Sequence, residues 1–248
     1  MNLAGNTVLI TGGGSGIGWA MAERFLQAGS EVVICGRRVE KLQEAQQQHS
    51  HLRTHACDLA DEADRVALFE WVKREVPQLN VLVNNAGIQR RLHLADDEHA
   101  QDWSGHRQEI ATNFDAPIHL TTLFIPLLRQ QSNPAIINVS SGLAFAPAAF
   151  APVYSATKAA LHSFTLSLRH QLAPTGIQVI EIVPPAVNTD LGGAGLHTWG
   201  VPLNEFTDSV MQRVADGELE IGYGTSETRR NASRAELDAF FNQMNRPS

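Results

Sequence analysis

Basic side chains and long apolar runs are scarce in this chain of 248 residues. Only 19 Lys and Arg stand against 26 Asp and Glu, which gives a formal net charge of -7. Nucleic acids and anionic lipids are bound through clustered basic side chains, so neither is an expected partner. No apolar stretch approaches the roughly 20 residues that span a bilayer, so no membrane segment is expected. The first residues show neither a basic region nor a cleavable apolar stretch, which predicts a cytoplasmic protein without a signal peptide.

Cysteine is also rare, and neither cysteine shows a functional spacing. Cys35 and Cys57 are too few for a disulfide scaffold and have no CxxC or Cys–His ligand pattern, so both are expected to be small buried side chains near strand ends. His49, His51 and His55 lie close together in the sequence, but no carboxylate or cysteine completes a ligand set with them. We therefore expect no metal site.

Apolar segments of strand length alternate with longer helical patterns along most of the chain. This alternation predicts one α/β domain over residues 1–248, a doubly wound, Rossmann-like parallel sheet of about seven strands with helices on both faces. The expected strands are residues 6–11, 31–35, 53–57, 81–83, 135–140, 178–183 and 219–221. The expected helices are residues 17–28, 38–48, 62–76, 98–129, 152–172, 204–216 and 233–244. Residues 188–201 contain four glycines and no periodicity, which predicts a mobile substrate loop.

A glycine-rich turn follows the first expected strand and opens the first expected helix. Glycines let the backbone approach phosphate groups closely, and a helix N-terminus offers free N–H donors and a favourable dipole. The turn therefore predicts a site for the pyrophosphate of a dinucleotide, and the alternative is an ordinary glycine-rich turn. Its spacing departs from the common G-x-G-x-x-G pattern. The residues assigned to this site are Thr11, Gly12, Gly14, Ser15, Gly16, Ile17 and Gly18.

The end of the second expected strand carries the residues that select the cofactor. An NAD enzyme usually has an Asp or Glu there, which binds the ribose 2′-hydroxyl. This chain has Gly36, Arg37 and Arg38 instead. The glycine removes the carboxylate that would repel a 2′-phosphate, and the planar guanidinium of Arg37 can bind that phosphate. The segment favours NADP(H) over NAD(H), and the alternative is two solvated arginines at the start of a helix.

Two further strand ends belong to the expected cofactor site. Asp58 and Leu59 come after the third strand, where the Asp58 carboxylate either accepts a hydrogen bond from the adenine amino group or caps the next helix. Asn85, Ala86 and Gly87 come after the fourth strand. Their small size would let the backbone line the adenosine ribose, although consecutive asparagines also suit a tight turn.

Tyrosine and lysine are rare, yet one pair stands at helical spacing. Tyr154 and Lys158, among two tyrosines and three lysines, lie four residues apart and therefore on one face of an expected helix. A nearby ammonium group and a nicotinamide cation would lower the pKa of the tyrosine hydroxyl and make it an acid–base catalyst. Ser141 ends the fifth strand, where its hydroxyl can donate to a substrate oxygen that gains negative charge. The alternative is a surface pair and a serine that only ends a strand.

With these motifs in this order, the chain resembles the short-chain dehydrogenase/reductase superfamily, in the branch whose chains have about this length. The resemblance covers residues 4–190 and includes Asn113 and the 184–189 segment. It implies that Tyr154 is the acid in reduction and the base in oxidation. It also implies that Tyr154 and Lys158 both contact the cofactor, Lys158 through the nicotinamide ribose. It also implies that Ser141 orients the carbonyl and that Asn113 holds a water of a proton relay.

The same resemblance implies cofactor contacts after the sixth strand, from Pro184, Val187 and Thr189. The family usually has Pro-Gly at the start of this segment, whereas this chain has Pro184-Pro185, and proline restricts the turn. A narrower resemblance is to an oxidoreductase subgroup that is sometimes encoded beside teichoic-acid D-alanylation genes. It rests on residues 81–89, 141–145, 167–172 and 243–245. No role in D-alanylation is inferred, because hydride transfer supplies no obvious step in that chemistry.

These observations predict an oxidoreductase that transfers a hydride between NADP(H) and a small-molecule carbonyl or secondary alcohol. The alternatives are a non-catalytic NADP(H)-binding sensor or scaffold and an NAD-linked alcohol dehydrogenase of the same fold. The residues expected to contact substrate are Leu143, Phe145, Phe150 and Trp199. Arg90 or Arg91 is a candidate for binding a substrate carboxylate or phosphate, and the alternative is that both are solvated. The helix at 152–172 is apolar on several faces, which predicts a homo-oligomer, and the family resemblance implies a homodimer or homotetramer.

Overall fold

The computed structural model describes residues 1–94 and 102–246. These residues form a seven-stranded sheet in the order β3-β2-β1-β4-β5-β6-β7, and every neighbouring pair is parallel. The strands are β1 (Thr7–Thr11), β2 (Glu31–Gly36), β3 (Arg53–Ala56), β4 (Val81–Asn84), β5 (Ala135–Val139), β6 (Gln178–Val183) and β7 (Glu220–Gly222). The order reverses beside β1, as in a doubly wound sheet, so the predicted fold class is confirmed.

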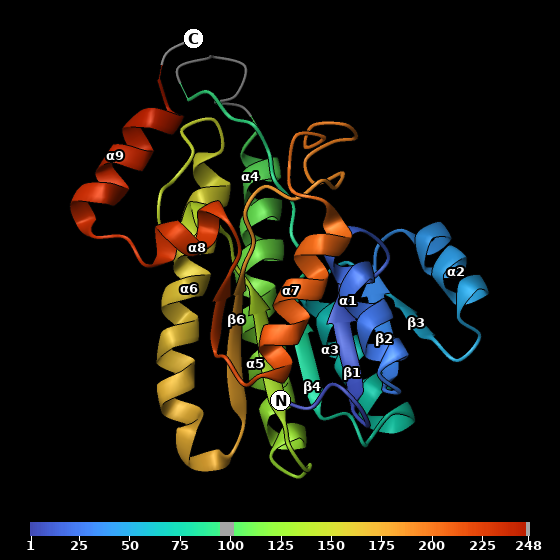
Figure 1. Ribbon diagram of the computed structural model, residues 1–248. Helices are drawn as coiled ribbons and strands as arrows, with labels where there is room; N and C mark the ends of the chain where they lie inside the picture. Colours follow the sequence, from blue (N-terminus) through green and yellow to red (C-terminus); the bar gives the residue numbers. More distant parts are fainter. Residues whose placement is uncertain (95–101, 247–248) are drawn as a thin grey trace.

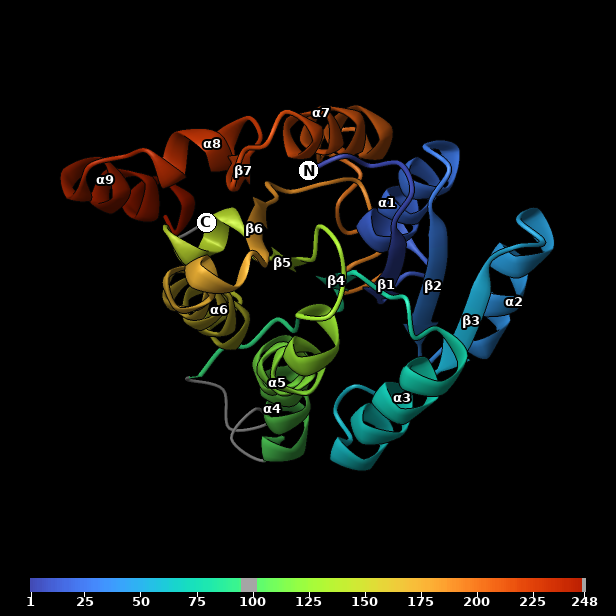
Figure 2. The same cartoon turned by 90° about the horizontal axis from the view of Figure 1, so that it is seen from below.

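Helices cover both faces of the sheet (Figures 1 and 2). One face packs against α1 (Gly16–Gln27), α2 (Val39–Gln48) and α7 (Leu203–Ala215). The other face packs against α3 (Glu62–Glu75), α5 (Ala116–Leu128) and α6 (Pro152–Leu172). Two further helices, α8 (Thr225–Arg230) and α9 (Arg234–Met244), follow β7 and lie near the N-terminal end of α6.

Alternation along the buried strands explains why both faces need helices. In β1, Val8 belongs to the core on the α1 side, whereas the next residue, Leu9, belongs to the core on the α5 side. Phe25 of α1 and Phe124 of α5 are fully buried on these two sides. Burial of one such ring contributes about 1.5–3 kcal/mol, so the two cores together hold the sheet between its helices.

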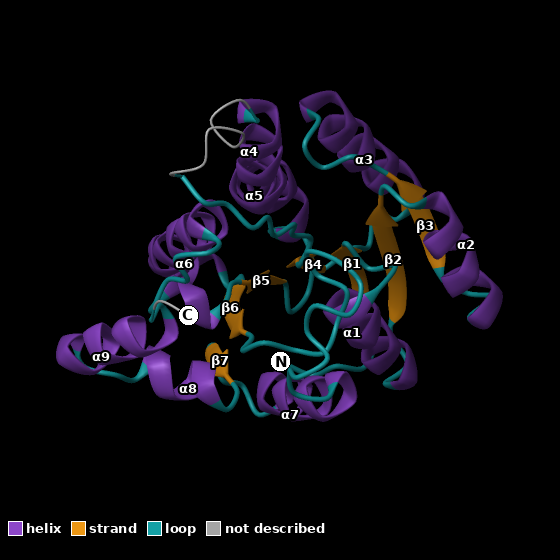
Figure 3. Ribbon diagram, turned by 90° about the horizontal axis from the view of Figure 1, so that it is seen from above, coloured by secondary structure: helices purple, strands orange, loops and turns teal. Residues whose placement is uncertain are grey.

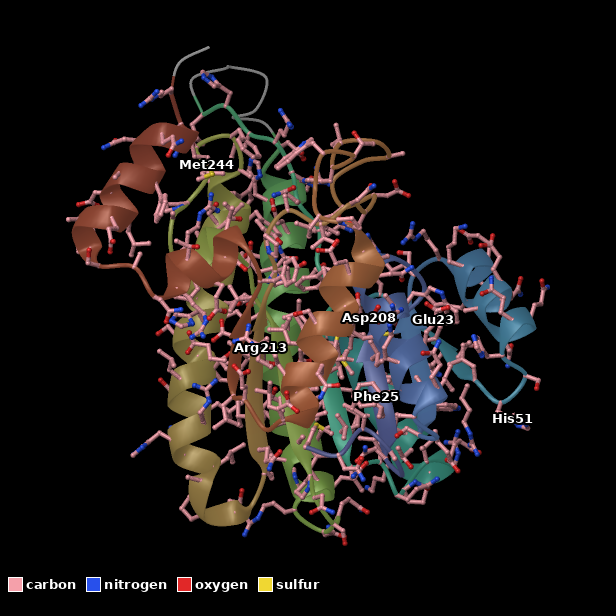
Figure 4. All side chains as sticks on the ribbon, viewed as in Figure 1. Glu23, Phe25, His51, Asp208, Arg213 and Met244 are labelled. Carbon is pink, nitrogen blue, oxygen red and sulfur yellow. The ribbon has the colours of Figure 1, made fainter. Side chains whose placement is uncertain are left out.

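The helices on the α1 face are also joined by charge. Arg24 of α1 donates from Nε to Asp208 Oδ1 of α7 at 2.9 Å, and its Nη1 lies 3.6 Å from Glu23 Oε2. Figure 4 shows Glu23 and Asp208 beside each other on these two helices. A pair with such an exposed carboxylate contributes little free energy, so the Arg24–Asp208 pair orients α7 on α1 more than it stabilises it.

The largest difference from the expected elements is in the helix predicted at 98–129. Its first residues lie outside the described ranges, and the rest is divided into α4 (Trp103–Ile110), a π-helical turn (Ala111–Asp115) and α5. The N–H of Ala116 donates to the carbonyl of Ala111, five residues earlier, and Pro117 has no N–H for the ordinary bond to Asn113. The prediction of one continuous helix was therefore wrong in its middle, because periodicity does not detect a single inserted residue.

Other expected elements agree with the structure to within two residues at their ends, except that α8 was not expected. Cys35 and Cys57 are buried and free, as expected. Within the described ranges, no helix is both long enough and apolar enough to cross a bilayer.

Candidate active site

A cavity of about 750 Å³ lies where the carboxyl ends of the strands meet. Figure 3 looks down on the loops that follow these strands. Of the residues predicted from sequence to bind cofactor, substrate or reacting groups, all line this cavity except Thr11, Arg91, Asn113 and Phe145. The described residues contain no group of three or more His, Cys, Asp and Glu side chains that could hold a metal ion.

The glycine turn brings backbone, and not side chains, to the cavity. Gly12 has φ +64°, and a Cβ there would lie 2.9 Å from the Cα of Ala86. A Cβ on Gly18 would lie 2.5 Å from the carbonyl oxygen of Gly12, so the turn and the start of α1 are in close contact. Ser15 precedes α1 without a side-chain cap, which leaves N–H groups of the first turn available to a ligand. These features fit the pyrophosphate of a dinucleotide.

Thr11 does not line the cavity, because it is buried at the end of β1 and its side chain contacts β4. Its hydroxyl accepts hydrogen bonds from the N–H groups of Asn85 and Ala86, both at 3.0 Å, and donates to the carbonyl of Val83 at 3.2 Å. The side chain of Asn85 donates in return to the Thr11 carbonyl at 2.9 Å. Thr11 therefore fixes the segment after β4 against the glycine turn.

The end of β2 is open, cationic surface. A Cβ on Gly36 would have no heavy atom within 4 Å. Arg38 donates from Nη2 to the hydroxyl of Ser15 at 2.6 Å, while the exposed guanidinium of Arg37 has no hydrogen bond or ion pair with the rest of the described chain. Arg37 is thus free to bind an anion beside Gly36.

Asp58 lies on the cavity wall and does not cap the next helix. The N-cap of α3 is Asp61, whose carboxylate accepts from the N–H of Ala63 at 2.7 Å. The Asp58 carboxylate instead accepts from the N–H of Ala60 at 3.0 Å, which leaves an oxygen for another partner. Of the two readings left open for Asp58, the capping one is therefore wrong.

Ser141, Tyr154 and Lys158 come together on one part of the cavity wall. Ser141 follows β5, which lies on the other side of β1 in the sheet from β2, the strand that Arg37 follows. Each is less than one-tenth exposed. The Lys158 ammonium donates to the carbonyl of Val139 at 2.8 Å and lies 5.6 Å from the centre of the Tyr154 ring. The Ser141 side chain is close enough to the Tyr154 hydroxyl to lower its pKa by hydrogen bonding. Three chemically useful groups thus lie together, mostly buried, on one part of the cavity wall.

Asn113 lies behind this group, within the π-helical turn. A Cβ on Gly87 would be 3.5 Å from Asn113 Oδ1 and 3.6 Å from Lys158 Nζ, so all three positions are close. The side-chain amide accepts from the N–H of Ile88 at 2.9 Å and donates to the Ile88 carbonyl at 2.8 Å. It also donates to the hydroxyl of Thr157 at 3.2 Å. The amide therefore joins the π-helical turn to the segment after β4.

Burial controls the acidity of both central groups. It raises the pKa of the Tyr154 hydroxyl well above its ordinary value; the bond from Ser141 opposes this rise, and the charge of Glu109 adds to it. Burial lowers the pKa of Lys158 to about 8, against the opposing attraction of Glu181. In the protein alone, burial thus acts against the lower tyrosine pKa expected from the neighbouring lysine.

A second buried pair lies on the far side of Lys158. Glu181 of β6 has no exposed surface, and its two carboxylate oxygens lie 3.1 and 2.9 Å from Nδ1 of His162, one helical turn after Lys158 on α6. This contact raises the pKa of His162, while burial and the charge of Arg169 oppose the rise. The ring of Phe145 packs against His162 with centroids 4.6 Å apart, which explains why Phe145 is absent from the cavity wall.

We expect the His162–Glu181 pair to make stability depend on pH. Because the pKa of His162 is raised in the folded state, its contribution is complete below the unfolded value of about 6.5 and is lost as pH rises through the folded value. Glu181→Gln should reduce the free energy of unfolding by about 1–3 kcal/mol at low pH and should flatten this dependence. Urea denaturation at a series of pH values measures both. Asp238→Asn, which breaks the exposed Arg234 pair, is the control, and an unchanged slope in Glu181→Gln would contradict the assignment.

Among the residues expected to meet substrate, Leu143, Phe150 and Trp199 line the cavity. Arg90 also lines it, but its Nη1 pairs with Asp102 Oδ2 at 2.9 Å, and Arg91 instead places its guanidinium 5.0 Å from the Phe150 ring. The lining residues that the sequence analysis missed include Thr112, Thr225, Arg229 and Met244. Three of these lie in α8 and α9, and no motif marks them because tertiary packing alone brings the C-terminal helices to the cavity.

Comparisons with known proteins agree with this architecture. The family model for short chain dehydrogenases matches residues 6–200. The uncharacterized oxidoreductase DltE of Bacillus subtilis is 47% identical over 99% of this chain and 98% of its own length, which confirms the narrower resemblance.

Solved structures with the same fold include a short-chain dehydrogenase from Sphingobium yanoikuyae in complex with NADPH, with TM-score 0.79 and 27% identity over 96% of this chain and 93% of that one. Another is a 3-ketoacyl-(acyl-carrier-protein) reductase from Brucella melitensis complexed with NADH. Its TM-score is 0.77, and it is 27% identical over 90% of this chain and 99% of its own. The chain therefore belongs to the short-chain dehydrogenase/reductase family and is an oxidoreductase of that family.

Proposed function

We propose that this protein transfers a hydride between NADP(H) and a carbonyl or secondary alcohol substrate. The observation that carries the proposal is the buried contact of Ser141, Tyr154 and Lys158 on the same cavity as the uncapped N-terminus of α1. A dinucleotide held by that terminus and by the end of β2 has its other half free to reach these three residues. A sensor or scaffold would not need a buried lysine and tyrosine at that position.

The proposed cofactor site extends from β2 to the segment after β6. The glycine turn and the α1 N-terminus would bind the pyrophosphate, and Arg37 and Arg38 would bind the 2′-phosphate. Asp58 and Leu59 would line the adenine, and residues 85–87 would line its ribose. Pro184, Val187 and Thr189, all on the cavity wall, would contact the nicotinamide end. The nicotinamide supplies the hydride in reduction and accepts it in oxidation.

The chain's own residues supply the proton and the orientation. The Ser141 hydroxyl would donate to the substrate oxygen and hold the carbonyl in place. Tyr154 would give its hydroxyl proton to that oxygen in reduction and take it back in oxidation. Lys158 would bind the nicotinamide ribose and, when charged, favour the tyrosinate that remains. Asn113, fixed to Ile88 beside Lys158, would complete a path by which the proton is replaced from water.

Arg37→Ala tests the cofactor preference. Loss of a charge-assisted bond to the 2′-phosphate should weaken NADPH binding about 10- to 100-fold and leave NADH binding nearly unchanged. Dissociation constants measured by calorimetry for both cofactors give the answer. Arg74→Ala removes an equally exposed charge at the end of α3 and should change neither constant. Equal affinity of the wild type for NADPH and NADH would contradict the preference, in favour of an NAD-linked enzyme of the same fold.

The proposed activity is tested by following NADPH absorbance with a panel of ketones, sugars, steroids and acyl thioesters. Consumption of NADPH that depends on one class is the expected result. Tight NADPH binding without consumption across the whole panel would support the sensor alternative.

We further propose a cytoplasmic homo-oligomer that folds as one domain over residues 1–248. On α6, Leu166 is 44% exposed, and a second copy would bury such a position. Size measurement in solution tests the assembly, and a monomer at micromolar concentration would refute it.

We also propose that residues 188–201 close over bound substrate. The bridge between Val187 and Val201 fixes both ends of this segment, while Trp199 within it remains exposed.

A further inference from the structure

Arg229 of α8 lies against the backbone that directly follows Ser141. A Cβ on Gly142 would be 3.0 Å from the Cβ of Ser226 and 3.6 Å from Arg229 Nη1. Helix α8 is fixed there because Ser226 donates its hydroxyl to the carbonyl of Val183. The backbone at Gly142 is fixed as well, because its N–H donates to the carbonyl of Pro184 at 2.9 Å. Arg229 therefore presents its guanidinium to the cavity beside a proposed catalytic serine.

The guanidinium of Arg229 has no carboxylate partner among the described residues. Its neighbour Arg230 pairs with Glu227 at 2.6 Å, and Arg213, labelled in Figure 4, pairs with Glu218 at 2.6 Å. Among the described residues, the guanidinium of Arg229 has one polar contact, with the sulfur of Met244, 3.8 Å from Nη2. Arg229 is half-buried, and burial lowers its pKa, so this charge has lost part of its water without gaining a counter-ion.

The end of α9 holds Met244 over this position. Asn245 accepts from the N–H of Ala149 at 2.6 Å and donates to the carbonyl of Pro147 at 3.0 Å. Figure 4 shows Met244 where α9 comes back to the loop after β5. The Met244 side chain thus covers one side of Arg229 but cannot neutralise its charge. A polar ligand could reach the guanidinium from the cavity.

The other cations of the cavity wall are occupied or lie at the other end. Arg90 is paired with Asp102, Lys41 is paired with Glu44 at 2.6 Å, and the Lys158 ammonium donates to Val139. Arg37 and Arg38 follow β2, at the end proposed for the 2′-phosphate. Arg229 is consequently the uncommitted guanidinium on the Ser141 side of the cavity.

We propose that Arg229 binds a carboxylate group of the substrate, so that the substrates are oxo acids and the corresponding hydroxy acids. The inference rests on the proposed function and specifies its substrate class. A guanidinium presents paired N–H donors that match the two oxygens of a carboxylate, and a half-buried charge without a partner gains most from such a ligand. The role that the sequence left open for Arg90 or Arg91 thereby falls to Arg229, since both of those are engaged elsewhere.

The test compares each oxo acid with its own methyl ester. For reduction of 4-oxopentanoate and 5-oxohexanoate, one NADPH and one proton are consumed and the ketone becomes a secondary alcohol. Wild type should show kcat/KM about 10- to 100-fold higher for the acids than for the esters. Arg229→Gln should remove this preference by weakening the acids while the esters remain within about threefold of wild type. Arg234→Gln, which removes an exposed charge at the start of α9, should retain the preference.

Two further readouts separate binding from turnover and from folding. Calorimetric titration of the same acids into the protein–NADP⁺ complex should show at least a tenfold weaker affinity in Arg229→Gln. Its melting temperature should not fall, because the replaced charge has no carboxylate partner among the described residues, whereas loss of the paired Arg230 should lower it. Equal kcat/KM for acids and esters in wild type, or an equal loss for both in Arg229→Gln, would overturn the inference and leave the proposed function standing. Carboxylate binding that depends on Arg229 without any NADPH consumption would instead overturn the proposed function alone.

Discussion

Tyr154→Phe should reduce kcat about 10²- to 10⁴-fold, which is the usual contribution of a positioned acid–base group. The variant removes one buried oxygen and with it the hydroxyl that bonds Ser141 and would protonate the substrate. NADPH affinity should change little, because the glycine turn, the end of β2 and Lys158, which are proposed to hold the cofactor, keep all their groups. Steady-state and single-turnover measurements with NADPH distinguish a loss of chemistry from a loss of binding.

The chain offers a matched control, because Tyr223 is its only other tyrosine. Its hydroxyl donates to Glu205, and it lies outside the cavity wall. Tyr223→Phe should retain full kcat. If Tyr154→Phe were as active as Tyr223→Phe, the proton would come from another group and the proposed role of Tyr154 would be wrong.

Gly18→Ala should weaken NADPH binding more than tenfold and destabilise the fold by about 1–3 kcal/mol, the usual cost of overpacking. The new methyl group would lie 2.3 Å from Asn85 Nδ2 and 2.5 Å from the Gly12 carbonyl oxygen. The Gly12 oxygen is backbone and cannot rotate away, so the turn itself would have to move. This displacement would also disturb the Asn85 bond to Thr11, which orients the segment after β4.

Gly29, just beyond the other end of α1, separates stability from cofactor binding. It has φ +85° and no heavy atom within 4 Å of a Cβ, so alanine there is strained without a clash. Gly29→Ala should cost about 1–2 kcal/mol of stability with no change in NADPH affinity. Chemical denaturation and cofactor titration of both variants give the comparison. An unchanged NADPH affinity in Gly18→Ala would show that the glycine turn does not hold the cofactor.

The sheet and the central site could be predicted from the sequence because both depend on local patterns. Strand β6 was predicted at its observed bounds, since a buried parallel strand is a short apolar run. Tyr154 and Lys158 were paired from their spacing on one helix, and Ser141 was placed with them because parallel strands end at a common edge.

What could not be predicted depends on contacts between distant parts of the chain. The π-helical turn that carries Asn113 results from one extra residue in a helix, to which a 3.6-residue period is insensitive. Phe145 was expected at the substrate, but its ring turns to His162, whose position is set by Glu181 on another strand. Arg229 gave no signal at all, because only the packing of Ser226 against Gly142 brings α8 to the cavity.

The most direct test of the account is the transfer of deuterium from NADPH labelled at the transferable position of its nicotinamide. The wild-type protein would be incubated with this cofactor and a mixture of ketones, sugars, steroids and oxo acids, and the products analysed by mass spectrometry. The account predicts an alcohol that carries one deuterium on the former carbonyl carbon, formed by wild type and not by Tyr154→Phe. Tight binding of the labelled cofactor with no deuterated product from any member of the mixture would contradict it.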